Sequence, residues 1–381
     1  MQINSKLPNV GTTIFSQMSA LAKKHGAINL SQGFPDFDCS PELVELTYKN
    51  MKNGNNQYAD MAGLPILRDS IANKCNLLYG VSLNAGLDIT ITAGGTQALF
   101  TAISAFIHKG DEVIVFEPCY DAYQPAVHIN GGIVVPIVLR SPYFEIPWAE
   151  VAAKISPRTR MVIVNTPHNP CGTIMGQQEW RQLAELLRPR PDIIVLSDEV
   201  YEHLTFDGKK HESILSYPEL FERGLAVFSF GKLLHATGWK VGYAIAPPKL
   251  SAEFRKVHQY VVFSVNTPVQ MAIEEYIRNA DSYLGLSAFF ENKRDFFLDR
   301  LGGSRFKWIP SSGSYFQLLD YSAISDETDT ELAIQWTQHA GIASIPVSVF
   351  YSAPVRQRVL RFCFAKREDT LQMAAEILCR L

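Results

Sequence analysis

Cysteine is scarce in this chain of 381 residues, and its few copies are scattered. There are six cysteines, and no two of them form a C-x-x-C pair. That spacing argues against a disulfide scaffold and against a zinc ribbon, so we expect no metal site. Free thiols in a reducing compartment are the simplest explanation, which makes a cytoplasmic protein the expectation.

Long apolar runs and an excess of one charge are also missing. No stretch is apolar enough to span a bilayer, and no apolar signal segment follows the first residues. The formal net charge is −3 and there is no polybasic run, so no general field attracts nucleic acid or an anionic membrane. We therefore expect small-molecule partners, no nucleic acid and no membrane. The hydrophobic content of 47% is ordinary for a globular protein that buries a large core.

Short apolar runs alternate with helical patterns through the middle of the chain. The runs are nearly continuous in apolar residues, which is typical of strands covered by helices on both faces of a mostly parallel sheet. The pattern predicts an α/β fold whose central sheet is flanked by helices. The runs lie at residues 88–92, 112–116, 161–164, 193–196, 225–228 and 241–246.

The pattern changes after about residue 270 and predicts a smaller α+β domain. A long helical stretch is followed by a helix that ends near Gly341, by two short strands and by a final amphipathic helix. We assign residues 41–270 to a large domain, and residues 1–40 with 271–381 to the small one. The expected elements of the small domain are helices over 268–301, 331–339 and 371–381, and strands over 342–345 and 359–364.

Distinctive polar residues follow four of the apolar runs directly. They occupy residues 94–96, 165–172, 198–201 and 229–232. Ligands of open α/β sheets gather outside the carboxyl ends of the strands, so several polar segments at strand ends predict one shared site.

Lys232 is the last residue of one of these polar segments, and a second lysine, Lys240, follows eight residues later. Taken alone, Lys232 could be a surface lysine at the end of a strand. Burial near another cation, however, lowers the pKa of a lysine and frees its amine to attack an aldehyde. A reactive amine beside groups that suit a phosphate points to pyridoxal phosphate as cofactor.

The phosphate has candidate ligands in two segments. Gly94, Gly95 and Thr96 open a helical pattern, whose free N–H groups and dipole attract anions. Ser229 and Lys240 add a hydroxyl and a positive charge. Two glycines before a helix are weak evidence by themselves, because they often mark only a tight turn.

The pyridine ring has candidate partners as well. A carboxylate at Asp198 would be costly to bury alone, and a protonated ring nitrogen or a nearby arginine would compensate it. Asn169 and Tyr201 could donate to the phenolate oxygen of the ring, and Tyr120 could lie flat on it. An Asn-Pro turn explains Asn169 equally well, and core packing explains the two tyrosines.

Arg361 is a charge inside the apolar segment 359–364. A buried guanidinium requires an anion, and its planar fork matches a carboxylate through two hydrogen bonds. A substrate carboxylate and a structural salt bridge are both open at this point.

Together these motifs resemble the class I aminotransferases of pyridoxal phosphate fold type I over nearly the whole chain. Within that family the chain is most similar to the kynurenine aminotransferase/glutamine transaminase K branch, and especially to bacterial methionine aminotransferases. The resemblance is carried by Ser229-Phe230-Gly231-Lys232, Thr237-Gly238-Trp239-Lys240, Ser197-Asp198-Glu199-Val200-Tyr201, the segment 165–172, Gln32-Gly33-Phe34-Pro35 and Arg361-Phe362-Cys363-Phe364.

The resemblance implies a role for each matching residue. It implies that Lys232 is the Schiff-base lysine, that Arg361 takes the substrate α-carboxylate, and that two subunits share their active sites in a homodimer. The remaining implied roles are Asp198 at the pyridine nitrogen, Asn169 and Tyr201 at the ring oxygen, Tyr120 on the ring face, Gly95, Thr96, Ser229 and Lys240 at the phosphate, Tyr58 at the partner's phosphate, Asn169 and Gly33 beside the substrate carboxylate, and Phe263 in the neighbouring pocket.

The implied activity is transfer of the amino group of an L-amino acid to a 2-oxo acid through pyridoxal and pyridoxamine phosphate. Aromatic residues at Tyr58, Tyr120, Phe263 and Phe350 favour methionine or an aromatic amino acid as donor. A β-lyase acting on cysteine conjugates needs nearly the same groups and is the main alternative. A ligand-sensing regulator is more remote, because the chain before Gly33 is too short for a winged helix.

Overall fold

A computed structural model describes residues 4–8 and 10–381 of the chain. Its main sheet has seven strands in the order β2-β8-β7-β6-β5-β3-β4. The pairs from β7 through β4 are parallel, and β8 runs antiparallel to both β7 and β2. The strands are β2 (Ile89–Thr92), β3 (Glu112–Glu117), β4 (Ile133–Val138), β5 (Thr159–Asn165), β6 (Ile194–Asp198), β7 (Gly224–Ser229) and β8 (Gly242–Ile245).

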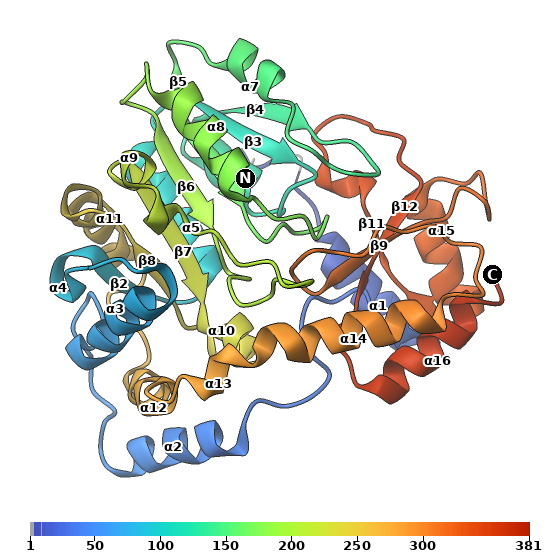
Figure 1. Ribbon diagram of the computed structural model, residues 1–381, viewed down its shortest axis with the longest axis horizontal. Coiled ribbons are helices and arrows are strands. Elements are labelled where there is room, and N and C mark those ends of the chain that lie inside the picture. The colour runs from blue at the N-terminus through green and yellow to red at the C-terminus, as the bar shows by residue number, and fades with distance from the viewer. Residues whose placement is uncertain (1–3, 9) are drawn as a thin grey trace.

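Helices cover this sheet, as Figure 1 shows, so that its inner strands are buried on both faces. The helices are α2 (Pro41–Lys52), α3 (Pro65–Tyr79), α4 (Ala85–Asp88), α5 (Gly95–Phe106), α6 (Tyr123–Ile129), α7 (Trp148–Lys154), α8 (Gln177–Leu187), α9 (Pro218–Phe221), α10 (Phe230–Leu233), α11 (Pro248–Val261) and α12 (Thr267–Ile277). The α/β architecture and mostly parallel sheet predicted from the apolar runs are therefore present.

A smaller group of elements joins the two ends of the chain. Strand β12 (Val359–Cys363) lies between β9 (Phe316–Asp320) and β11 (Ile345–Pro346), antiparallel to both, and β1 (Ile28–Asn29) pairs in parallel with β10 (Ile342–Ala343). Figure 1 shows the blue helix α1 beside the red C-terminal elements. The helices here are α1 (Ile14–His25), α13 (Asp281–Leu284), α14 (Leu286–Arg300), α15 (Asp329–Gln335) and α16 (Glu368–Leu378). The division at residues 40 and 270 stays a prediction.

Local sequence signals explain several of the helix ends. The Thr13 hydroxyl accepts a hydrogen bond from the Ser16 N–H and caps α1, which ends at Gly26 with a φ of 63°. Helix α15 begins with a capping box between Thr328 and Glu331. It continues through one π-helical turn to Gly341, whose φ of 81° ends it as the sequence predicted.

Several elements differ from the sequence prediction. The expected strand over 342–345 is divided between β10 and β11, which belong to different sheets, and strand β9 was not predicted. The expected helix over 268–301 is three helices, α12, α13 and α14, because the chain turns at residues 278–280 and again at Gly285. Strand β4 was not predicted; it is an edge strand that is half exposed and contains Pro136. Proline is tolerated at a sheet edge, where its missing N–H removes no ladder hydrogen bond.

Two further findings concern the cysteines and the length of the helices. All six cysteines are free, and Cys379 alone is exposed. Over residues 4–8 and 10–381, no helix combines the length and apolar character that crossing a membrane requires.

Candidate active site

A cavity of about 390 Å³ opens at the carboxyl ends of the parallel strands. Residues from β5, β6 and β7 meet there because the register pairs Asn165 with Asp198, and Asp198 with Val227. Eleven of the thirteen predicted site residues line it: Gly33, Gly95, Thr96, Tyr120, Asn169, Asp198, Tyr201, Ser229, Lys232, Lys240 and Arg361.

Lys232 lies on the single helical turn α10, directly after strand β7. Its Nζ donates hydrogen bonds to the carbonyl of Gly33 at 2.9 Å and to the hydroxyl of Tyr315 at 2.8 Å. Burial, together with smaller contributions from the charges of Arg361 and Lys240, lowers the pKa of this amine to about 8. A substantial fraction of the amine is therefore neutral and nucleophilic near pH 8.

Asp198 ends strand β6 and is buried, with an exposed fraction of 3%. Its Oδ2 accepts a hydrogen bond from the Tyr123 hydroxyl at 2.5 Å, and its Oδ1 accepts one from the Val200 N–H at 3.4 Å. Burial raises the pKa of Asp198 to about 6 in spite of these two donors. A cationic partner at this carboxylate would remove that penalty, and a protonated pyridine nitrogen is such a partner.

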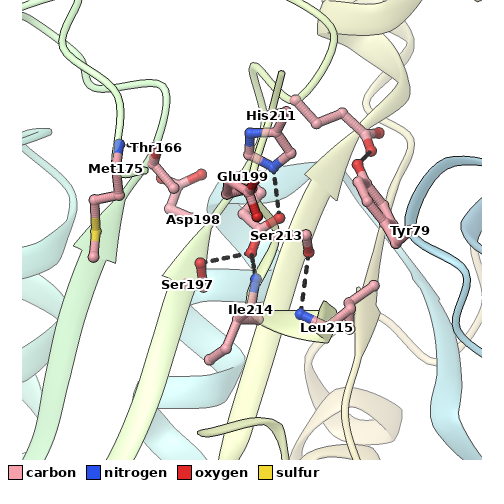
Figure 2. A network of polar contacts seen from close by, with 12 residues as sticks. Tyr79, Thr166, Met175, Ser197, Asp198, Glu199, His211, Ser213, Ile214 and Leu215 are labelled. Carbon is pink, nitrogen blue, oxygen red and sulfur yellow. Dashed lines mark hydrogen bonds and ion pairs between the residues drawn. The ribbon is translucent and has the colours of Figure 1, made fainter. Parts of the chain in front are cut away.

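A second buried carboxylate, Glu199, anchors the turn that carries Asp198. Figure 2 shows Ser197, His211 and Ile214 converging on it. Its Oε1 accepts from the Ser197 hydroxyl at 2.8 Å and from the Ile214 N–H at 3.0 Å, while His211 lies 2.8 Å from Oε2. These contacts fix the turn next to Asp198.

Gly94 and Gly95 form the start of helix α5, where the first N–H groups are free for an anion. A Cβ on Gly95 would lie 2.9 Å from the side chain of Val200, so any larger residue would force Val200 to move. The Lys240 Nζ lies 3.4 Å from the point where a Cβ of Gly94 would be, which places its charge at this helix end. Thr96 Oγ1 is 3.1 Å from the Tyr120 hydroxyl.

Arg361 is fully buried on strand β12. It donates to Oδ1 of Asn169 at 2.9 Å and to the carbonyl of Ser31 at 2.7 Å, and its Nε has no hydrogen-bond partner among the described residues. Burial lowers the pKa of this guanidinium to about 10. No carboxylate of the described residues forms a salt bridge with it, so it retains capacity for an anion. The salt-bridge alternative for Arg361 is therefore not what the geometry supports.

Two predicted residues lie outside the cavity. Tyr58 and Phe263 are exposed, with 81% and 51% of their surface accessible, and their rings pack edge to face at 5.2 Å. Their predicted roles involve a second subunit, and this single chain leaves both rings on its surface. Those roles stay predictions.

Several site residues were missed by reasoning from the sequence. Phe15 and Phe316 line the cavity and flank the Arg361 guanidinium at 5.2 and 4.0 Å from their ring centres. Tyr123 and Tyr315 contact Asp198 and Lys232. Tyr123 follows Tyr120 by three residues, but nothing in the sequence separates it from a core aromatic.

Comparison with known proteins identifies the family. Residues 25–378 match the model of the family described as aminotransferase class I and II. The chain is 51% identical to a methionine aminotransferase of Escherichia coli, over 99% of this chain and 98% of the relative. It is 34% identical to human kynurenine–oxoglutarate transaminase 1, over 94% of this chain and 93% of the relative.

Solved structures agree with the sequence relatives. The chain superposes on YbdL of Escherichia coli, described as having a methionine aminotransferase function, with a TM-score of 0.98 at 50% identity and full coverage of both chains. N-succinyldiaminopimelate aminotransferase of Mycobacterium tuberculosis gives 0.95 at 33% identity, also over both full chains. The predicted fold type I architecture and the transaminase assignment are confirmed. The chain belongs to the class I and II aminotransferase family.

Proposed function

We propose that this aminotransferase uses pyridoxal phosphate to move the amino group of methionine or an aromatic L-amino acid to a 2-oxo acid. One observation carries the proposal. A single cavity holds the amine of Lys232, whose pKa is lowered, the buried carboxylate of Asp198 and the buried guanidinium of Arg361, which has no anion among the described residues. When bound, the cofactor supplies an aldehyde that condenses with amines and a cationic ring that accepts electrons.

The residues of the cavity fit this cofactor. The glycine start of α5 with Lys240 and Ser229 suits its phosphate, and Asp198 suits its ring nitrogen. Because a guanidinium only donates, Asn169 turns its amide oxygen to Arg361, and its NH₂ group remains for the ring oxygen or the substrate carboxylate.

Arg361 then binds the α-carboxylate of the amino acid, which fixes the substrate Cα relative to Lys232. The Lys232 Nζ takes the proton from Cα as a general base and later returns it as a general acid. Asp198, ionised above about pH 6, keeps negative charge beside the ring and stabilises the charge that develops on proton removal.

The side-chain preference follows from the walls of the cavity. Phe15, Phe34 and Phe316 line it, and Arg361 is the only arginine among the described lining residues. No second guanidinium is therefore available there for a distal carboxylate, which favours apolar donors over aspartate. The similarity to a methionine aminotransferase supports the same preference.

A homodimer completes the proposal. The exposed Tyr58 and Phe263 form an aromatic pair that a second subunit would bury, and burial of such rings is a strong driving force for association. Sedimentation of the purified protein is expected to give twice the mass of one chain. A cytoplasmic location is part of the same proposal.

Substitution of Lys232 tests the function. In Lys232→Ala we expect no visible absorbance from condensation with pyridoxal phosphate, and turnover of methionine with a 2-oxo acid about 10²–10⁴-fold lower or worse. Lys256→Ala, which removes an exposed lysine paired with Glu253 on α11, is the matched control and should behave as wild type. Transamination retained by Lys232→Ala would contradict the proposal. A screen with methionine, phenylalanine, tyrosine and aspartate tests the donor preference.

A further inference from the structure

Tyr315 and Gly33 hold the amine of Lys232 in a closed hydrogen-bonded triangle. The Lys232 Nζ donates to the Tyr315 hydroxyl at 2.8 Å and to the Gly33 carbonyl at 2.9 Å. The Tyr315 hydroxyl in turn donates to the same carbonyl at 2.6 Å. The three groups come from segments up to 282 residues apart in the chain, so only the folded protein assembles them.

The number of protons on each group limits which of these bonds can form together. A phenol has one proton, and that of Tyr315 goes to Gly33, so its oxygen accepts from Lys232. A neutral amine has two protons and one lone pair. When each acceptor receives one of these protons, the remaining position on Nζ is left for the lone pair. An ammonium in the same place would have a third N–H without a partner among the described residues.

Both acceptors of the triangle are closely packed. Tyr315 is 1% exposed, and its ring packs edge to face on Tyr201 at 5.1 Å and against Phe290 at 5.8 Å. Gly33 lies so close to Phe316 that an added Cβ would be 2.8 Å from the ring. This packing restricts the position of both acceptors, which therefore favour one resting position for the amine.

We propose that Tyr315 is a positioning residue for Lys232, holding the amine with both N–H groups occupied so that its lone pair is directed into the cavity whenever the amine is not bonded to the cofactor. This rests on the proposed function, because it assumes that Lys232 is the reacting amine. The aromatic packing of Tyr315 alone would require only its ring, whereas positioning requires its hydroxyl.

The step affected first is the condensation of Lys232 with an aldehyde. The Nζ forms a C=N bond to the aldehyde carbon, the C=O bond breaks, and the oxygen leaves as water with the two amine protons, so no oxidant or further reactant is needed. The second affected step is proton removal from the substrate Cα, which uses the same lone pair. Binding of the substrate carboxylate at Arg361 does not involve Tyr315 and should be unaffected.

Tyr315→Phe tests the inference in the apoprotein. Pyridoxal, which lacks the phosphate, is added over a range of pH, and condensation is followed by visible absorbance. We expect the limiting rate at high pH to fall about 10- to 100-fold, as for a misplaced reacting group. Tyr321→Phe is the matched control, because it removes another buried hydroxyl, bonded to the Glu327 carbonyl, remote from the site. It should keep the wild-type rate.

The loaded enzyme gives a second readout. In Tyr315→Phe, kcat should fall while KM for methionine stays within about twofold, and the isotope effect of Cα-deuterated methionine should rise as proton transfer becomes rate-limiting. Wild-type condensation rates and isotope effects in a folded Tyr315→Phe would overturn the inference and leave the proposed function intact. Failure of the wild-type protein to condense or to transaminate would instead sink the proposed function.

A second substitution tests the inference if the first variant does not fold. If Tyr315→Phe does not fold, 3-fluorotyrosine at position 315 keeps the ring and its size while weakening the phenol oxygen as an acceptor. A smaller decrease of the same limiting rate is then expected, and an unchanged rate would count against positioning by the hydroxyl.

Discussion

The hydroxyl of Tyr123 donates a hydrogen bond of 2.5 Å to the carboxylate of Asp198. Both side chains are buried, and the only other donor within reach of that carboxylate among the described residues is the Val200 N–H at 3.4 Å. Tyr123 is therefore the main group that favours the ionised form of Asp198, against a burial penalty that raises its pKa to about 6.

Tyr123→Phe should shift the pH dependence of cofactor binding. Without the hydroxyl the carboxylate anion loses one hydrogen bond, worth about 1.5–3 kcal/mol to a charged acceptor, so the pKa of Asp198 should rise by about one unit or more. Because the ring nitrogen needs an anionic partner, the pH below which affinity is lost should move upward by the same amount. Titration of apoprotein with pyridoxal phosphate at several pH values measures this.

Ionisation of the cofactor itself affects the pH profiles of Tyr123→Phe and wild type equally, because both proteins bind the same molecule. The difference between the two profiles therefore reports on the protein. Tyr321→Phe is again the control for loss of a buried hydroxyl. Identical pH profiles for Tyr123→Phe and wild type would show that this hydrogen bond does not govern Asp198.

Arg361→Ala should raise the apparent KM for amino acids by about 10²-fold or more, because truncating one partner of a buried charged pair costs roughly 2–5 kcal/mol. Arg361→Lys should recover only part of this, since an ammonium lacks the planar fork that matches a carboxylate. Steady-state kinetics with methionine give the value. Visible absorbance of the bound cofactor provides the folding control, and an unchanged KM with intact absorbance would place the carboxylate site elsewhere.

Lys74 forms a buried ion pair with Glu202, which belongs to the turn after Asp198, at an Nζ–Oε1 distance of 2.6 Å. Burial alone raises the pKa of Glu202, but the Lys74 ammonium outweighs it and holds that pKa well below its usual range. Because the folded pKa is depressed, the pair stabilises the fold fully above the unfolded value near pH 4–5 and is lost only in stronger acid.

Single changes at this pair should be more costly than the double change. Lys74→Met or Glu202→Gln should each lower the free energy of unfolding, by about 3–5 kcal/mol where a charge stays buried without its partner. Lys74→Met combined with Glu202→Gln should recover much of the loss. Chemical unfolding of the apoprotein measures all four proteins, and strictly additive losses would refute a coupled pair.

The sequence determined which chemistry is present and at which strand ends. Lys232, Asp198 and Asn169 each follow an apolar run closely, and Arg361 interrupts one, so local pattern was enough to identify them. Burial and strand direction are encoded over a few residues, and the carboxyl ends of parallel strands meet at one edge. The same logic gave the mostly parallel sheet, while the edge strand β4, half exposed and interrupted by Pro136, lacked the continuous signal.

Only the tertiary structure decided which group each of these residues meets. Tyr123 reaches Asp198 across 75 residues, Tyr315 reaches Lys232 across 83, and Arg361 reaches Asn169 across 192. A buried tyrosine has the same local pattern whether its hydroxyl contacts a reacting amine or another core group. Its partner depends on how distant segments pack, because hydrogen bonds between them form only after the chain has closed, and no short stretch of sequence contains that information.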